Sequence, residues 1–255
     1  MPTNFLRDWS NQQALQQKLA VPVEWYQSID STNIRAQHLI AKQPRSPYLI
    51  VSNQQTAGYG KQQRPFISDR GGIFLTWIQT IPTLNSTNHG LLTIAAVSAL
   101  HQTIAQYWQR TTVIKWVNDL LWQHHKIAGI LIEQSRTPWV SIGIGLNLYQ
   151  AHITNQVPQA GNLLTAPPAN QDIVNFLFQL VQNLSICLEH FTTGECLTYY
   201  RQYLSTLGQW VQVQMGTRHL QGQVQDINDA GNLILQTANQ QYVIAAGDII
   251  EPLSY

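Results

Sequence analysis

Hydrophobic residues fall into two kinds of pattern along this chain as far as residue 204. Apolar runs of the length and composition of buried strands lie at residues 24–28, 48–53, 72–80, 112–117, 120–133 and 139–148. The fifth run is expected to fold into a hairpin at Gln123-His124-His125. Apolar residues spaced along one helical face predict helices at residues 32–42, 91–108, 173–191 and 195–204, and an N-terminal helix carrying Phe5, Leu6, Leu15 and Leu19.

The predicted elements indicate the fold class. Val, Ile and Leu dominate the strand-like runs, as a sheet covered by helices requires. Strands and helices mix without strict βαβ alternation. We therefore predict an α+β fold in which helices cover a mixed sheet.

The pattern changes after Gly208. Short alternating segments lie at residues 210–215, 219–227, 233–236 and 242–245, separated by turn signals such as Met215-Gly216 and Asp229-Ala-Gly231. Their even spacing predicts a small β-barrel. We expect a catalytic domain at residues 1–206 and a second domain at residues 207–255.

Composition narrows the function. Charged residues are 11% of the chain, against roughly 25% in typical soluble domains, so each cation is more informative than usual. A net charge of +1 gives no electrostatic case for nucleic-acid binding. The chain shows neither a signal peptide nor an apolar run of membrane-spanning length, and its two cysteines lack metal-ligand spacing. We expect a cytoplasmic protein without membrane contact.

Two segments carry the candidate chemistry. The first is a glycine loop, Gln55-Thr-Ala-Gly58-Tyr59-Gly60-Lys61-Gln-Gln-Arg64. Glycines let backbone N–H groups approach phosphate oxygens, although a lone Gly-x-Gly is more often an ordinary turn. The second is Lys115-Trp-Val-Asn118-Asp119, followed by Lys126-Ile-Ala-Gly129-Ile-Leu. Lys126 is either a strand-end lysine that reaches solvent or a cation held for use.

Four segments occur in the order known from one family. They are Ser31-Thr32-Asn33, Gln55-x-Ala-Gly58-x-Gly60, the Lys115–Leu131 block, and Gly143-Ile-Gly-Leu-Asn147. The chain resembles the biotin protein ligases from about Val23 to its C-terminus. The resemblance implies the biotin–lipoate ligase catalytic fold, which is similar to class II aminoacyl-tRNA synthetases, and an SH3-like C-terminal barrel. It also implies a biotin–[acetyl-CoA carboxylase] ligase, which forms biotinyl-5′-AMP from biotin and ATP and passes biotin to a lysine of the biotin carboxyl carrier protein.

The resemblance assigns roles residue by residue. It implies biotin binding by Ser31, Thr32, Asn33, Gln55, Gly58, Tyr59, Lys126 and Gly129. It implies nucleotide binding by Gly60, Lys61, Arg64, Phe66, Lys115, Asn118, Asp119 and Asn147. Catalysis falls to Lys126, Lys61 and Arg64, and Lys126 bridges the biotin carboxylate and the phosphate. Asp119 is also the candidate Mg²⁺ ligand. ATP, Mg²⁺ and biotin are then required, but no tightly bound prosthetic group.

The loop departs from the family's usual Gly-Arg-Gly-Arg-x-Gly-Arg-x-Trp. Lys61 stands where arginine is usual, Gln63 where glycine is usual and Phe66 where tryptophan is usual, while Val117 replaces the proline of Lys-Trp-Pro-Asn-Asp. Cationic and aromatic character are kept. Retention of the intermediate is the property that these changes affect.

Two other functions stay open. A lipoate or octanoyl ligase shares the fold, but the chain lacks the Arg-Arg…Gly-Gly-Gly motif of lipoate ligases. A non-catalytic biotin-binding regulator is disfavoured because Lys126 and the loop cations are present. The segment before Val23 is too short for a winged helix-turn-helix, so no DNA partner is expected. The sequence does not choose between a monomer and a homodimer.

Overall fold

The computed structural model describes residues 9–136, 138–151 and 153–252. Its helices are α1 (Trp9–Leu19), α2 (Thr32–Ala41), α3 (His89–Trp108), α4 (Ile153–Gln156), α5 (Asn170–Glu189) and α6 (Glu195–Tyr203), with one 3₁₀ turn, η1 (Lys61–Gln63). Its strands are β1 (Val23–Tyr26), β2 (Tyr48–Ser52), β3 (Ile73–Thr80), β4 (Val113–Lys115), β5 (Asp119–Trp122), β6 (His125–Arg136), β7 (Trp139–Leu146), β8 (Trp210–Met215), β9 (Arg218–Ile227), β10 (Leu233–Gln236), β11 (Gln241–Ile244) and β12 (Asp248–Pro252). The pattern did not predict η1, α4 or β12, and Phe5 and Leu6 lie outside the described residues.

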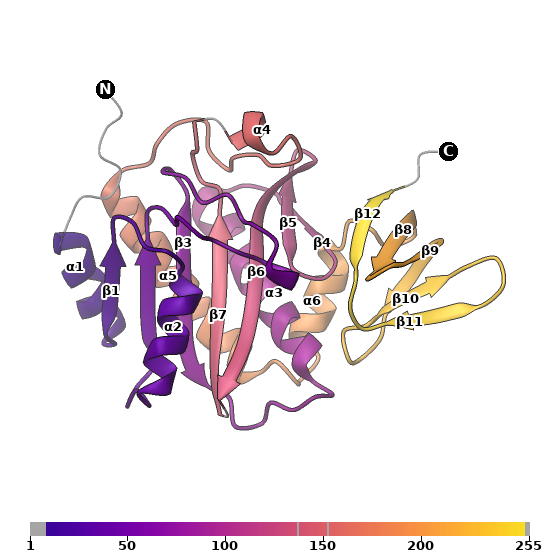
Figure 1. Cartoon of the computed structure of the whole chain (residues 1–255), viewed down its shortest axis with the longest axis horizontal. Coiled ribbons are helices and arrows are strands. Elements are labelled where there is room, and N and C mark those ends of the chain that lie inside the picture. The colour runs from indigo at the N-terminus through magenta and orange to yellow at the C-terminus, as the bar shows by residue number, and fades with distance from the viewer. Residues whose placement is uncertain (1–8, 137, 152, 253–255) are drawn as a thin grey trace.

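One mixed sheet organises the larger part of the described chain. Its strands run in the order β1-β2-β3-β7-β6-β5-β4 (Figure 1). β1 pairs in parallel with β2, and the other neighbours are antiparallel. The hairpin between β5 and β6 turns at Gln123 and His124, whose positive φ values of 49° and 67° suit a two-residue type I′ turn. The expected α+β class and this hairpin are confirmed.

The two faces of the sheet carry different layers. Ile73, Leu75 and Trp77 of β3 join the main core beneath α3, which α5 covers in turn. On the opposite face, Ile78 packs in a small separate core with Ile40 of α2. Figure 1 shows α2 crossing in front of the sheet and α3 behind it. The period-two alternation of a strand thus places Thr76, between Leu75 and Trp77, on the face that α2 covers.

A smaller antiparallel sheet follows the larger sheet and its helices. Its strand order in the described residues is β11-β10-β9-β8-β12. The fold agrees with the expected SH3-like domain, but the barrel expected from the spacing is not closed, because β11 and β12 remain at opposite ends of this order. The sequence pattern missed β12, which Gly247 precedes and Pro252 ends. The predicted boundary at residue 206 stays a prediction.

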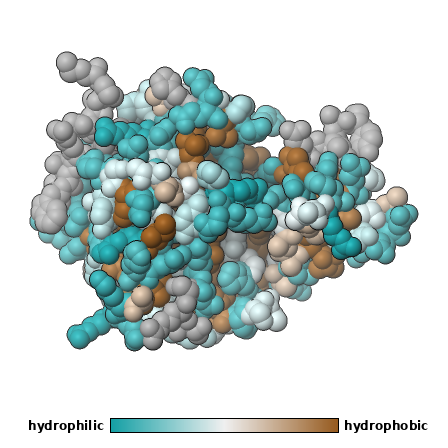
Figure 2. Space-filling view, in the orientation of Figure 1, coloured by the Kyte–Doolittle hydropathy of each residue, from teal (hydrophilic) through white to brown (hydrophobic). Residues whose placement is uncertain are grey.

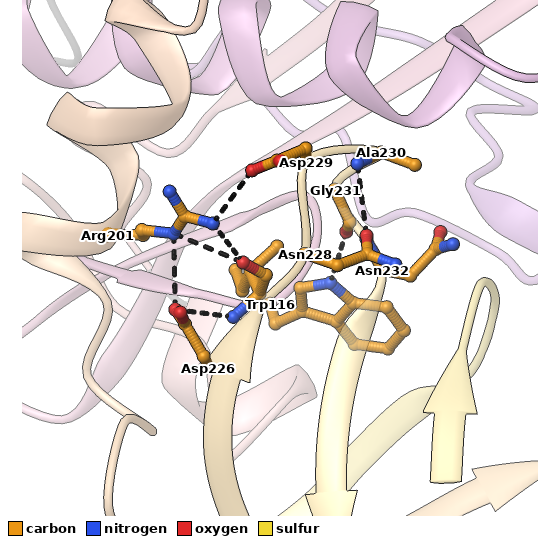
Figure 3. A network of polar contacts seen from close by, with 9 residues as sticks. Trp116, Arg201, Asp226, Asn228, Asp229, Ala230, Gly231 and Asn232 are labelled. Atoms are coloured by element: carbon orange, nitrogen blue, oxygen red, sulfur yellow. Dashed lines mark hydrogen bonds and ion pairs between the residues drawn. The ribbon is translucent and has the colours of Figure 1, made fainter.

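A polar network joins the two sheets (Figure 3). Arg201 on α6 donates to the Asp226 carboxylate at 3.1 Å and to the carbonyl oxygen of Ile227. The Trp116 indole, buried to 3% exposure, donates to the Gly231 carbonyl oxygen at 3.2 Å. Gly231 has a φ of 82°, which favours glycine. The turn between β9 and β10 is therefore tied to the Lys-Trp-Val-Asn-Asp segment.

The face of the molecule drawn in Figure 2 is mainly polar, although charged residues make up only 11% of the chain. Figure 2 shows hydrophilic residues over most of this face, with small hydrophobic areas scattered between them. Among the described residues, no helix combines the length and the hydropathy that a membrane crossing needs.

Candidate functional site

The floor of the candidate site is made by three glycines on neighbouring strands. Gly129 of β6 is paired with Gly145 of β7, and Gly143 lies two residues before Gly145 on the same face. A Cβ on Gly143 would lie 2.2 Å from Asn33 Oδ1, and one on Gly145 would lie 2.5 Å from the Phe66 ring. The missing side chains let Asn33 and Phe66 approach the sheet, and all three glycines line a cavity of about 310 Å³ above it.

One end of the cavity is lined by uncharged hydrogen-bonding groups. The Thr32 N–H donates to Gln55 Oε1 at 2.8 Å, and Gln55 Nε2 donates to Ser68 Oγ at 3.0 Å. The Thr76 hydroxyl lies 2.6 Å from Asn33 Oδ1 and 2.9 Å from the Thr32 hydroxyl. We call this group the neutral end. Its members come from α2, β3 and the glycine loop.

The N-terminus of α2 contributes to the neutral end. Ser31 caps the helix through its hydroxyl, which accepts a 3.5 Å contact from the Ile34 N–H. Ser31, Thr32 and Asn33 are all buried to 5% exposure or less. The first turn of a helix offers N–H groups that have no partner within the helix. This segment can therefore begin the helix and face a ligand at the same time, so its two expected roles are compatible.

The glycine loop folds back on itself across the cavity. The Phe66 N–H donates to the Gly58 carbonyl oxygen at 2.9 Å, and the Gly60 N–H donates to that of Arg64 at 2.8 Å. Gln62 and Gln63 have φ values of 57° and 58°. Gln63 therefore adopts the left-handed conformation that glycine takes more easily.

Phe66 forms the aromatic wall. Its ring lies over Gly145 and Gly129 and meets Phe74 edge-on, with ring centroids 6.4 Å apart. Lys126 Nζ is 6.0 Å from the centroid of the same ring. A larger side chain on either glycine would displace Phe66, so the glycines and the aromatic position are sterically linked.

The other end of the cavity gathers the cations. Lys126 Nζ lies 2.7 Å from Asp119 Oδ1, an ion pair without good hydrogen-bond alignment. Lys61 Nζ lies 3.2 Å from Asp248 Oδ1, and Arg64 Nη2 lies 2.7 Å from Asp248 Oδ2. We call this group the charged end. Lys115 lines the cavity as well.

Asp248 brings the second sheet into the site. It is the first residue of β12, and Lys61 Nζ also contacts the adjacent Gly247 carbonyl oxygen at 3.3 Å. Burial alone would raise the pKa of Asp248, but Lys61 and Arg64 outweigh burial and hold this pKa below its ordinary value of 3.8. The carboxylate is therefore charged at neutral pH and pairs with both loop cations, which leaves one net positive charge on the three side chains.

The expected Mg²⁺ site is tested by the surroundings of Asp119. Among the described residues, no cluster of three acidic, histidine or cysteine side chains could hold a metal ion. Asp119 and Asp248 are the carboxylates of the cavity lining, and each is paired with a cation. This set fits Mg²⁺ only in the manner usual for nucleotide enzymes, with one carboxylate and several phosphate oxygens.

All but two of the predicted site residues line this cavity. Those that do are Ser31, Thr32, Asn33, Gln55, Tyr59, Gly60, Lys61, Arg64, Phe66, Lys115, Asn118, Asp119, Lys126 and Gly129. Gly58 belongs to the loop but does not line the cavity, and a Cβ there would come within 2.4 Å of Ser68 Oγ. Asn147 is buried, and its amide lies 3.4 Å from the Lys126 carbonyl oxygen, so it contacts the strand of Lys126. The ligand roles of all these residues stay predictions.

Sequence reasoning missed three groups. Asp248 and Ile249 line the cavity from β12. Glu133 accepts hydrogen bonds from Asn33 and Tyr59. Thr76 joins the neutral end from β3. Thr76 is a polar residue inside an apolar strand pattern, which is a signal that could have marked it, whereas Glu133 stands at the end of its predicted run, where a carboxylate is commonplace.

Comparison with known proteins gives the family. A profile described as "Biotin/lipoate A/B protein ligase family" matches residues 25–147, and one described as "Biotin protein ligase C terminal domain" matches residues 206–250. The biotin–[acetyl-CoA-carboxylase] ligase of Mycobacterium tuberculosis is 30% identical over 210 residues, which cover 79% of this chain and 78% of that protein. The chain belongs to the biotin protein ligase family.

Other relatives and solved structures agree. The bifunctional ligase/repressor BirA of Bacillus subtilis is 27% identical over 249 residues, covering 88% of this chain and 72% of that protein. A biotin protein ligase from Aquifex aeolicus, in complex with biotin and ATP, superposes with a TM-score of 0.77 at 20% identity, over 89% of this chain and 97% of that one. A ligase from Leishmania major with biotinyl-5-AMP gives a TM-score of 0.63 at 19% identity, over 88% and 99%. These structures confirm the expected fold.

Proposed function

We propose that this protein is an ATP-dependent biotin protein ligase that makes biotinyl-5′-AMP and transfers biotin to a lysine of a carrier protein. The observation that carries this proposal is a single cavity with two chemistries. Its neutral end offers fixed donors and acceptors for a polar ring, and its charged end collects four cations. A carboxylate and a polyphosphate are both anions, so their reaction needs such a cationic surface.

The first step joins biotin to the nucleotide. A biotin carboxylate oxygen attacks the α-phosphorus of ATP, a P–O bond forms, and the bond to pyrophosphate breaks. Lys126 lies at the cavity floor beside Gly129, where its ammonium can face both reacting anions. Lys61 and Arg64 approach from the loop above. Their charges offset the repulsion between substrates, and Lys126 acts as an electrostatic clamp rather than as a nucleophile.

The second step transfers biotin. The neutral amine of the carrier lysine attacks the acyl carbon, a C–N bond forms, the C–O bond to AMP breaks, and the amine loses a proton. The loop cations stay beside the leaving phosphate in this arrangement. Mg²⁺ would supply additional charge neutralisation at the phosphates, and Asp119 is the residue we assign to it.

The neutral end favours biotin over lipoate. The biotin ring is a cyclic urea with two N–H donors and one carbonyl acceptor, whereas the ring of lipoate has neither. Thr32, Asn33 and Gln55 already have partners within the protein, but their remaining donor and acceptor capacity would find no counterpart in a ring without polar atoms. The profile over residues 25–147 covers both ligase classes, but the profile over residues 206–250 is described for biotin ligases.

Pyrophosphate exchange tests the proposal. Purified protein is incubated with ATP, labelled pyrophosphate, Mg²⁺ and either biotin, lipoate or octanoate. We expect exchange with biotin alone and, after addition of an apo carrier domain, labelling of one lysine. Exchange with lipoate or octanoate but not biotin would identify the other ligase class, and biotin binding without exchange would identify a regulator.

The proposal has finer parts. The carrier is assigned to acetyl-CoA carboxylase because the Mycobacterium tuberculosis relative bears that name. A cytoplasmic location agrees with the two unpaired cysteines, Cys187 and Cys196. Size-exclusion chromatography with light scattering decides between a monomer and a homodimer.

A further inference from the structure

Glu133 lies just outside the cavity and connects two of its walls. It lies on β6, two side-chain alternations after Gly129, and therefore on the same face of the sheet, which α2 covers. Its carboxylate accepts from Asn33 Nδ2 at 2.8 Å and from the Tyr59 hydroxyl at 3.0 Å. Asn33 belongs to α2 and Tyr59 to the glycine loop. One carboxylate thus contacts both walls.

The charge of Glu133 determines which way the Asn33 amide points. An ionised carboxylate has no hydrogen to donate, so the amide nitrogen of Asn33 must face it. Asn33 Oδ1 then faces Thr76, whose hydroxyl lies 2.6 Å away and must donate its one hydrogen there. Gly143 leaves room for this amide, because a Cβ would lie 2.2 Å from Oδ1.

The same constraint passes to Thr32. The Thr76 and Thr32 hydroxyl oxygens lie 2.9 Å apart, a distance that requires a hydrogen between them. The hydrogen of Thr76 already points to Asn33, so Thr32 supplies it. Gln55 Oε1, which accepts from the Thr32 N–H at 2.8 Å, is a second acceptor within reach of the Thr32 hydroxyl, at 3.1 Å, and either acceptor keeps the hydroxyl hydrogen inside the protein. The Thr32 hydroxyl oxygen is left with a lone pair for the cavity.

We propose that Glu133 is a positioning residue that fixes the hydrogen-bond direction from Thr32 through Thr76 to Asn33, so that the Thr32 hydroxyl presents an acceptor to an N–H of a cyclic urea. This inference rests on the proposed function. Glu133 reaches the ligand only through other residues. Burial and the neighbouring Glu133 raise the pKa of Tyr59, so this phenol keeps the hydrogen that it donates to Glu133.

Glu133→Gln tests the direction of the hydrogen bonds that run from Thr32 through Thr76 to Asn33. An amide can donate as well as accept, so the variant permits the Asn33 amide and both hydroxyls to reverse. We expect the KM for biotin to rise about ten-fold with kcat and the KM for ATP nearly unchanged. Thr76→Val removes the middle hydroxyl at similar volume and should produce the same change, whereas Thr76→Ser should not.

Glu24→Gln is the matched control. Glu24 accepts from Arg35 of α2 at 2.6 Å and from the hydroxyls of Tyr26 and Tyr48 at 2.7 Å and 3.1 Å. It therefore ties the same helix to the sheet, but it is absent from the described lining of the cavity. We expect Glu24→Gln to lower the melting temperature as much as Glu133→Gln does and to leave the KM for biotin unchanged.

The double variant Glu133→Gln/Thr76→Val separates this role from a general loss of packing. The two side chains are linked through Asn33, so the second change should add little to the KM for biotin once the first has disrupted this series of hydrogen bonds. Additive increases in KM, or an equal increase with Glu24→Gln, would overturn the proposal. Should Glu133→Gln not fold, Thr76→Val and Thr76→Ser give the same decision. Absence of biotin-dependent exchange in the parent would instead refute the proposed function.

Discussion

The neutral and charged ends of the cavity are prepared for their ligands in opposite ways. At the neutral end, Thr32, Asn33 and Gln55 already hydrogen-bond to one another or to groups behind them. At the charged end, the cations are paired with carboxylates, Lys126 with Asp119 and the loop cations with Asp248. One end is thus ready to bind, while the other must exchange partners.

The difference follows from the chemistry of the two ligands. An uncharged ring binds more tightly to donors and acceptors that are already fixed, because binding then requires no ordering of the side chains. Isolated cations close together would repel one another, so carboxylates hold them until phosphates arrive. We therefore expect the neutral end to control the affinity for biotin and the charged end to control the rate and the affinity for ATP.

Lys126→Ala provides the largest test of this comparison. Loss of the central cation should slow biotinyl-AMP formation by a factor on the order of 10²–10³, because a preorganised electrostatic contact is removed from the transition state. Single-turnover formation of biotinyl-AMP measures the rate. Biotin methyl ester lacks the carboxylate and probes the neutral end alone, so its affinity should not change.

A control variant is Lys42→Ala, an exposed lysine at the end of α2. It should behave like the parent in both measurements. A Lys126→Ala protein that forms biotinyl-AMP at a near-normal rate would remove Lys126 from the catalytic residues, and weaker binding of the methyl ester would show that the two ends are not separate.

Gly143→Ala and Gly145→Ala form a matched pair for the cavity floor. Both lie on β7 on the same face, but the new methyl group would meet Asn33 in the first and Phe66 in the second. Overpacking of this kind costs about 1–3 kcal/mol, which corresponds to roughly 5- to 150-fold in an equilibrium constant. Gly143→Ala should weaken the binding of biotin methyl ester, whereas Gly145→Ala should mainly slow biotinyl-AMP formation. Calorimetry and single-turnover kinetics measure the two effects, and equal effects would contradict a divided site.

Local pattern predicted most of the fold and the neutral end. Apolar runs located the strands of the main sheet, and the four motifs contain Thr32, Gln55 and Lys126, which line one cavity. These residues lie in or beside regular elements, so their position along a strand or helix determines where they point. The hairpin at Gln123 was predictable because its turn residues are local.

Contacts between distant segments could not be predicted in the same way. Asp248 lies 184 positions along the chain from Arg64, and its role depends on how the small sheet packs against the loop. Glu133 meets Asn33 across 100 positions. Neither residue stands in a motif that the sequence marks, and a carboxylate in a polar turn or strand end is usually a solvated one. Tertiary packing alone brings these acids to the site.

Asp248→Asn tests whether the second sheet competes with substrate for the loop cations. Ion pairs with partly exposed side chains contribute at most about 1 kcal/mol, so the effect should be modest. We expect the KM for ATP to fall by up to about five-fold, because phosphate no longer displaces a charged carboxylate. The KM for biotin should be unchanged.

Asp226→Asn is the control for Asp248→Asn. Asp226 is also a carboxylate of the small sheet, and it pairs with Arg201 outside the described lining of the cavity. It should leave the KM for ATP at the value of the parent. A higher KM for ATP in Asp248→Asn would show instead that this carboxylate supports nucleotide binding.

Salt gives the smallest and most selective test. The pKa of Asp248 is lowered by Lys61 and Arg64, so its contribution to the closed loop is present above the ordinary value of 3.8 and is lost only as the pH falls through the lowered value. Any change in loop cutting between pH 5 and pH 7 is therefore not caused by protonation of Asp248.

Raising the salt concentration to about 1 M should screen the ion pairs of Asp248 and increase the rate of protease cutting of the ligand-free loop by up to a few-fold. Asp248→Asn should be cut faster at low salt and respond less to added salt, while the affinity for biotin methyl ester stays constant in both proteins. If the loop of the parent is cut at the same rate at every salt concentration, these ion pairs do not hold it closed, and the contrast between the two ends reduces to their composition.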